Sequence, residues 1–199
     1  MSIVLMGSTS GSCTLQEQAV AGSSVITLPV GTGTAVVNGV NSAIVHGTAV
    51  ASTSGTSIDF TGIPSWVKRV TVMLQGVSLN AAASIAIRLG TSGGVVATGY
   101  VARQANIVAS AANGANETTG FVFGTGNVSS DLWSGSVVIN NLTGNNWIAA
   151  GACVQTAGTT FTTFPCGSIA LGAALDRVRI TTTAGTASFN AGTINILYE

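Results

Sequence analysis

The chain has 199 residues, of which only 6% are charged, and its six basic and six acidic residues cancel to a net charge of zero. Typical domains are about 25% charged, and without a basic surplus we expect no electrostatic binding to nucleic acid. Small polar residues interrupt every apolar run before about 18 residues, so no membrane span or membrane insertion is expected. Low net charge protects poorly against self-association. We therefore expect sister copies or partner proteins to cover much of the surface.

The first fifty residues differ in pattern from the rest. They offer short strand-like pieces, such as 25–28, between Gly- and Ser-rich spacers. None is long enough to build its own core, and a two-stranded piece alone is marginal in water. We predict an N-terminal extended arm or anchoring segment over residues 1–50, with the boundary in the small polar residues 51–57.

Residues 51–199 carry an all-β pattern, because Val, Ile and Thr dominate and Gly, Asn and Ser clusters recur at short intervals. In 69–75, Val70, Val72 and Leu74 should share one buried face, and the residues between them should point the other way. The same alternation appears in 84–90 and 132–140. Further strands are predicted at 95–103, 118–123, 147–155, 161–171, 176–183 and 193–198, with turns at 91–94, 113–116, 143–146 and 183–186.

Eight or nine strands in residues 51–199 predict a jelly-roll-like antiparallel β-sandwich. The shortage of charge and the small Ala, Gly, Ser and Thr faces favour close packing between identical subunits, and we expect a homotrimer. An arm without charge can still bind a neighbour by adding a strand to a sheet edge, because main-chain hydrogen bonds supply the affinity.

Three cysteines, Cys13, Cys153 and Cys166, are widely spaced, and only one histidine is present. This pattern does not fit a structural zinc site. Cys153 and Cys166 could bridge neighbouring strands, but buried free thiols in a chain folded in a reducing cytoplasm are favoured. We predict no metal and no cofactor.

A catalytic role is not expected. His46 is the only histidine. Serine is so abundant that a Ser-His-Asp triad could be assembled from the sequence by chance, and only the geometry of the side chains would make it meaningful. Glycoside hydrolysis needs two carboxylates flanking one bond, and the candidates are Asp59, Glu117, Asp131 and Asp176. Asp59 suits a strand end or corner, and Asp176 suits a turn cap or a pair with Arg177. We predict that the protein is not an enzyme.

Candidate contact residues follow the corner at Pro64. Trp66 either plugs the end of the sandwich or offers a stacking platform for a glycan. Lys68 and Arg69 stand side by side before an apolar run and should face opposite sides of the strand. They form either a solvated strand start or a contact to an acidic patch on a neighbouring subunit.

A second group of candidates could bind a glycan. Tyr100 and Trp147 offer rings that stack on sugars, and Asn145 lies in the Asn-rich segment "NNLTGNN" at 140–146. Asparagine side chains offer donors and acceptors to sugar hydroxyls. The alternative for Trp147 is a place in the core.

Three stretches resemble proteins of tailed-phage virions. "TLQEQAVAGSSVITLPVGTGTAVV" is similar to the N-terminal segment of tail-fibre proteins. "SGTSIDFTGIPSWVKRVTVMLQGVS" and "DRVRITTTAGTASFNAGTINILYE" resemble the opening and the closing strands of a C-terminal module of phage fibre and other virion proteins. The resemblance implies a trimeric virion protein, assembled in the host cytoplasm, whose arm binds other virion proteins. It implies either a short tail fibre or tail-tip protein for host attachment, or a head decoration, cement or head-fibre protein.

Overall fold

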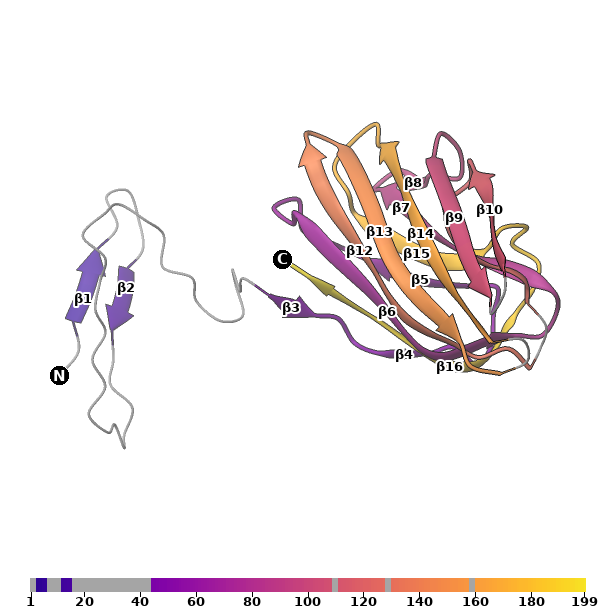
Figure 1. The fold of residues 1–199 in the computed structure, drawn as a ribbon. Helices are drawn as coiled ribbons and strands as arrows, with labels where there is room; N and C mark the ends of the chain where they lie inside the picture. Colours follow the sequence, from indigo (N-terminus) through magenta and orange to yellow (C-terminus); the bar gives the residue numbers. More distant parts are fainter. Residues whose placement is uncertain (1–2, 7–11, 16–43, 109–110, 128–129, 158–159) are drawn as a thin grey trace. The chain divides into compact units, whose positions relative to one another are not determined.

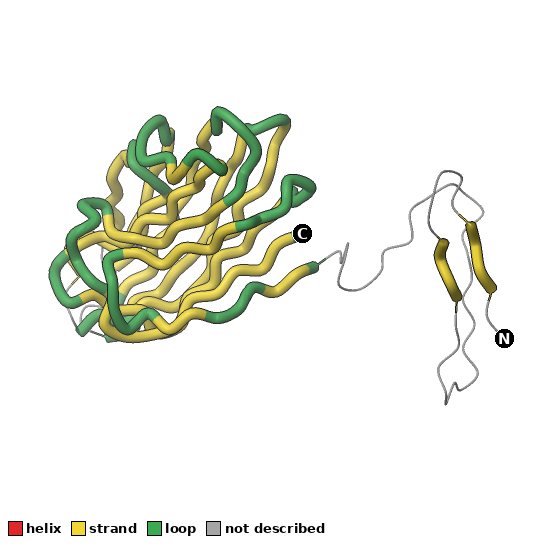
Figure 2. The backbone as a smooth tube through the Cα atoms, turned by 180° about the vertical axis from the view of Figure 1, so that it is seen from behind, coloured by secondary structure: helices red, strands yellow, loops and turns green. Residues whose placement is uncertain are grey.

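A computed structural model describes residues 3–6, 12–15, 44–108, 111–127, 130–157 and 160–199. The chain divides into two units, Met1–Val37 and Asn38–Glu199. In the first unit, β1 (Ile3–Met6) pairs with β2 (Ser12–Leu15) as antiparallel strands, Ile3 opposite Leu15. The strand-like piece predicted at 25–28 lies outside the described residues. Every regular element of the described residues is a β-strand (Figure 2).

The second unit is a sandwich of two antiparallel sheets, which confirms the predicted fold class (Figure 1). The large sheet has the order β10-β9-β14-β13-β12-β6-β16-β3, and β4 also pairs with β16. The small sheet has the order β11-β7-β15-β5, and β8 also pairs with β7. The strands are β3 (Val45–His46), β4 (Val50–Ala51), β5 (Ser57–Thr61), β6 (Arg69–Leu79), β7 (Ala83–Thr91), β8 (Gly94–Val95), β9 (Val101–Val108), β10 (Ala111–Glu117), β11 (Phe121–Asn127), β12 (Trp133–Thr143), β13 (Asn146–Gln155), β14 (Phe161–Ala170), β15 (Arg177–Thr182) and β16 (Phe189–Tyr198).

The strand order is that of a jelly roll. With β3 and β4 counted as one broken first strand, the quartet β3/β4-β16-β6-β12 belongs to one sheet and the quartet β5-β15-β7-β11 to the other. The first and last strands therefore pair, and the chain crosses between sheets at most of its connections, as in the eight-stranded double Greek key. The two remaining hairpins, β9–β10 and β13–β14, add four strands to the large sheet beyond β12.

Strict alternation builds the core between the sheets. Val70, Val72 and Leu74 of β6 are buried, as predicted, and so are the alternate residues Ile85, Ile87 and Leu89 of β7. Full burial of each such side chain contributes about 1.5–3 kcal/mol. At one end of the core, the Trp133 ring contacts the rings of Phe123 and Phe161 edge-on, with centroids 6.1 and 5.2 Å away.

Three sequence predictions need correction. The predicted arm over 1–50 extends too far, because β3 and β4 pair with β16 and so belong to the sandwich. The predicted turn at 113–116 lies inside β10, where Asn113 pairs with Asn106 of β9. The strand predicted at 95–103 is split between β8 and β9, with a break through 96–100. In each case a partner strand supplies backbone hydrogen bonds that local composition does not reveal.

Candidate interaction surface

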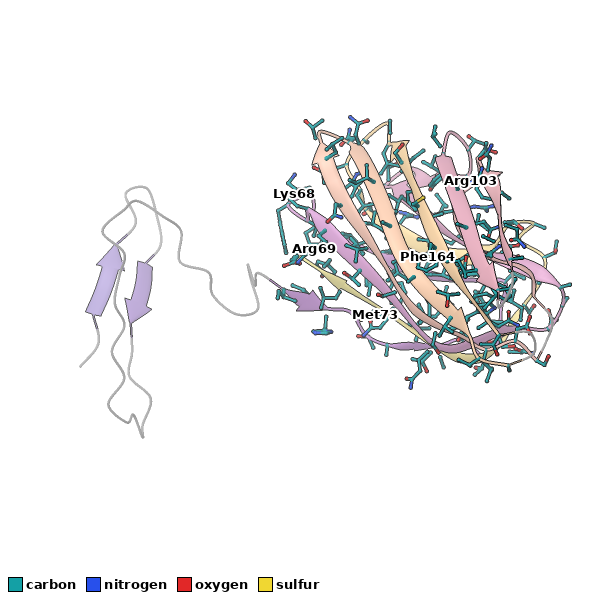
Figure 3. The ribbon with its side chains drawn as sticks, in the orientation of Figure 1. Lys68, Arg69, Met73, Arg103 and Phe164 are labelled. Carbon is teal, nitrogen blue, oxygen red and sulfur yellow. The ribbon has the colours of Figure 1, made fainter. Side chains whose placement is uncertain are left out.

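The side chains of the large sheet that point away from the small sheet form a broad surface, here called the outer face. Its strands are in front in Figure 1, and Figure 3 shows Met73, Phe164 and Arg103 spread across them. One row of directly paired residues crosses seven strands from β9 to β3, and none of its members is buried. The row is Arg103, Cys166, Ala150, Val138, Thr71, Leu197 and His46.

Large apolar side chains are exposed on this face. Val101 and Ile107 of β9 are 75% and 54% exposed, Ile148 of β13 is 41% exposed, and Phe164 of β14 is 38% exposed. Ala150 and Ala152 of β13 are exposed on the same face, where their small side chains project little from the sheet. Several large exposed apolar side chains on one face indicate a site of protein association.

Charge is scarce on the outer face. Within the described strands, the face carries Arg103 in β9 and Arg69 at the start of β6 as its formally charged side chains. Arg103 donates a hydrogen bond from Nη1 to Asn116 Oδ1 at 2.8 Å. Arg69 forms an ion pair with Glu199 of the same chain. Few charges have to lose water when such a face is covered, so covering it costs little desolvation energy.

The outward side of the small sheet has the opposite character. There Arg179 of β15 pairs with Asp59 of β5, and Arg88 of β7 lies opposite Arg179. Arg88 donates hydrogen bonds to the carbonyls of Thr119 and Thr183. Arg177 binds Asp176 through Nε and Nη2, at 3.1 and 2.9 Å, which confirms the predicted pair. The outward side of the small sheet is thus richer in charge than the outer face, which exposes more large apolar side chains.

Three of the candidate carboxylates of the described residues form ion pairs or hydrogen bonds within the chain. Asp59 binds Arg179, Asp176 binds Arg177, and Glu117 accepts a hydrogen bond from Gln104 Nε2 at 3.1 Å. Asp131 is buried, and His46 lies on β3 opposite Leu197. Among the described residues, no group of three His, Cys, Asp or Glu could hold a metal ion.

Four of the six predicted contact residues lie at or near the surface. Trp66 is 39% exposed, and its ring is 6.1 Å from that of Tyr198, so it borders the sandwich end without closing it. Lys68 and Arg69 are exposed, and their backbone N–H groups both donate to the carbonyl of Glu199. Asn145 lies in the β12–β13 turn, and its carbonyl accepts from Leu171 N–H at 3.0 Å. Asn141 N–H donates to the Lys68 carbonyl, which brings the β12–β13 hairpin and the start of β6 to the same end of the sheet.

The other two predictions, Tyr100 and Trp147, are wrong as surface contacts because both rings are buried. The ring of Tyr100 packs edge-on against Phe121. Its hydroxyl accepts a hydrogen bond from Leu89 N–H at 2.7 Å and donates one to the Val96 carbonyl at 3.1 Å. Burial raises its pKa from 10.0 to about 12, against the opposing effects of the Leu89 hydrogen bond and the Arg88 charge. Trp147 belongs to the core, which was its alternative assignment.

Cys153 and Cys166 are both free thiols. They lie on opposite faces of the large sheet, Cys153 buried inside and Cys166 exposed on the outer face, so they do not bridge. The expectation of buried thiols therefore holds for Cys153 and is wrong for Cys166. Burial raises the pKa of Cys153 to about 12, which leaves it protonated and unreactive. The side chain of Cys13 lies outside the description.

The sequence predictions missed the apolar members of the outer face: Val101, Ile107, Ile148 and Phe164. The signal was present in 147–155, where Ile148 alternates with the buried Trp147 and Ala149. A strand with apolar residues on both faces, on a chain this poor in charge, indicates that both faces are covered. For β9 the signal was missed because the predicted strand, 95–103, ended before most of β9.

Comparisons of the chain with protein-family models, curated proteins and solved structures gave no match. In the described residues, no helix has the length and apolar character needed to cross a membrane.

Proposed function

We propose that this chain is a structural protein of a tailed-phage virion, and that it acts as a short trimeric tail fibre or tail-tip protein in host attachment. The observation that carries the structural role is the difference between the two sides of the sandwich: the outer face exposes large apolar side chains and few charges, whereas the outward side of the small sheet carries the Asp59–Arg179 ion pair together with Arg88 and Arg177. The resemblance of three stretches of the chain to phage fibre and virion proteins supplies the context.

In this proposal the outer face is the contact between copies in the trimer. Ile148 on β13 and Phe164 on β14 form its apolar centre, with Ala150 and Cys166 paired between them. Interfaces of obligate homo-oligomers resemble a domain core and are depleted of charge at their centres. The outer face has this composition. The charged side of the small sheet remains in contact with water.

The first unit provides the attachment to other virion proteins. Its described strands, β1 and β2, form a short antiparallel pair. An extended segment of neutral composition binds a neighbouring sheet edge through main-chain hydrogen bonds. The exposed end of the sandwich, with Trp66, Lys68 and Asn145, is the proposed contact with a host surface glycan.

A head decoration, cement or head-fibre role is the second candidate. All described strands from β3 to β16 belong to the sandwich, and the described residues 44–199 hold no coiled coil or β-helix shaft. A compact trimer with an N-terminal arm can clamp neighbouring capsid subunits and bind across them. This geometry suits a lattice as well as it suits a tail tip.

Copy number in the purified virion separates the two roles. A fibre protein is expected in tens of copies and a decoration protein in hundreds, so the amount of this chain is measured against the major capsid protein by quantitative gel or mass spectrometry. Binding of the isolated full chain to host cells, competed by host polysaccharide, supports the fibre role, and binding to empty capsids supports decoration. Absence of the chain from purified virions overturns both.

A further inference from the structure

The interior of the sandwich is not uniformly apolar. On the inner side of the large sheet, Gln104, Asn106, Thr163 and Gln155 are each at least 98% buried. They come from β9, β14 and β13. In each, one side-chain oxygen has no hydrogen-bond partner among the described residues. The indole N–H of Trp133 on β12, fully buried, also has none.

The strand register brings these groups together. Thr163 lies opposite Asn106, and Gln104 is the next residue on the same face of β9. Gln155 lies opposite Trp133 and diagonal to Thr163, which is itself opposite Cys153. Directly opposed Cβ atoms are about 4.5–5.5 Å apart and diagonal ones about 7–8 Å, within reach of Gln and Asn side chains.

The amide groups are oriented with their oxygens free. Gln104 donates from Nε2 to Glu117 Oε1 at 3.1 Å, and Asn106 donates from Nδ2 to Asn113 Oδ1 at 3.0 Å. Both acceptors belong to β10, so the amide oxygens of Gln104 and Asn106 are turned away from that edge strand. Gln155 donates from Nε2 to the Ala157 carbonyl at 2.8 Å. A carboxylate and a carbonyl only accept, which fixes the orientation of the Gln104 and Gln155 amides.

We propose that this polar cluster binds a small group of internal water molecules. An unsatisfied buried acceptor costs about 1–3 kcal/mol, and these oxygens, each one opposed, diagonal or same-face position from the next, can be satisfied by donors from outside the chain. About two water molecules supply four protons to the four oxygens and can accept the Trp133 N–H. A metal cation fits less well, because the four oxygens are neutral and the indole N–H would point at the ion.

A crystal structure of the full chain tests this site, at a resolution that shows ordered solvent. Water bonded to at least two of the four oxygens is the expected result. Side chains that have repacked to pair with one another, with no solvent between them, overturn the proposal. An anomalous signal at the cluster after a rubidium soak overturns it in favour of a cation.

A matched pair of variants gives a second readout. Thr182 is also fully buried with an unpartnered hydroxyl, but it lies on β15, in the small sheet. Thr182→Val removes an unsatisfied group and should leave Tm unchanged or higher. Thr163→Val removes a ligand of the bound water and should lower Tm by about 2–4 °C. If both variants keep or raise Tm alike, the Thr163 hydroxyl binds no water and the proposal fails.

Discussion

Arg179 of β15 donates two parallel hydrogen bonds to Asp59 of the neighbouring strand β5, Nε to Oδ1 and Nη2 to Oδ2, each 2.6 Å long. Bidentate geometry is the strongest form of an ion pair. It also raises the pKa of Arg179, chiefly through the hydrogen bond to Asp59. On the other side, Arg179 lies opposite Arg88. The negative charge of Asp59 therefore offsets the repulsion between the like charges of Arg179 and Arg88.

We expect Asp59→Asn to lower the free energy of unfolding at low salt, because it removes the ion pair with Arg179. The loss should be only about 1 kcal/mol, since the pair is one-third exposed and solvent screens it. Added salt should shrink the loss by screening the repulsion between Arg88 and Arg179. Urea unfolding of wild type, Asp59→Asn, Arg179→Gln and the double variant measures the coupling. A loss that is independent of salt contradicts the electrostatic account.

A charge on the outer face should break the trimer. Ile148→Asp places a carboxylate at the apolar centre of the proposed interface, where burial of an unpaired charge costs several kcal/mol. Light scattering after size-exclusion chromatography should show a monomer in place of a trimer. The control is Thr61→Asp, an exposed position on β5 of the small sheet, which should remain trimeric. Dissociation of both variants, or of neither, rules out the outer face as the contact.

The thiols offer a chemical probe of the same surface. In a Cys13→Ser background, Cys166 is the exposed thiol and Cys153 the buried one. Iodoacetamide should label Cys166 slowly in the proposed trimer and several-fold faster in the Ile148→Asp variant, since the proposed assembly covers the outer face. Peptide mass spectrometry separates the two sites. Cys153 should stay unlabelled in both until the chain unfolds, and equal rates at Cys166 argue against its burial on assembly.

Alkaline pH should destabilise the sandwich through Tyr100. Its pKa is raised from 10.0 to about 12 by burial, so the folded chain holds this proton longer than the unfolded chain. The contribution is fully present below pH 10 and is lost between pH 10 and 12, at most roughly 2–3 kcal/mol. Cys153 adds a loss of the same sign from pH 9 upward.

Tyr198→Phe leaves Tyr100 as the single tyrosine of the chain, so the ultraviolet absorbance of tyrosinate should titrate with a midpoint near 12. Tyr100→Phe should show a shallower fall in stability above pH 10. At neutral pH that variant should be less stable by about 1–3 kcal/mol, because Leu89 N–H loses its acceptor. A Tyr100 midpoint near 10 refutes the prediction.

Gly192 is required where β16 bulges against β6. Its φ is +99°, and an added Cβ would lie 2.5 Å from the carbonyl oxygen of Gly76, itself at φ +61°. Gly192→Ala should lower the free energy of unfolding by about 1–3 kcal/mol or more. Gly172→Ala, where nothing lies within 4 Å of the added Cβ, should be neutral or slightly stabilising. Equal thermal melts for the two variants would refute the strain at Gly192.

Alternation predicted the strands whose two faces differ sharply. In β6 and in β12, buried apolar residues alternate with more exposed ones, and the expected faces are the observed ones. β10 could not be predicted, because "AANGANE" owes its extended form to pairing with β9 and not to its own propensity. The burial of Tyr100 could not be predicted either. It depends on contacts with Phe121 and Leu89, which lie on other strands and are not indicated by the residues next to Tyr100 in the sequence.

The two added hairpins give the protein a way to vary. β9–β10 is inserted between β7 and β11, and β13–β14 between β12 and β15, yet both extend only the far edge of one sheet. The 143–146 turn joins the framework strand β12 to the added strand β13, so mutations or peptide grafts there should leave the eight-strand framework in register. Substitution of the bulge glycine Gly192, by contrast, acts directly on the pairing of the framework strands β16 and β6.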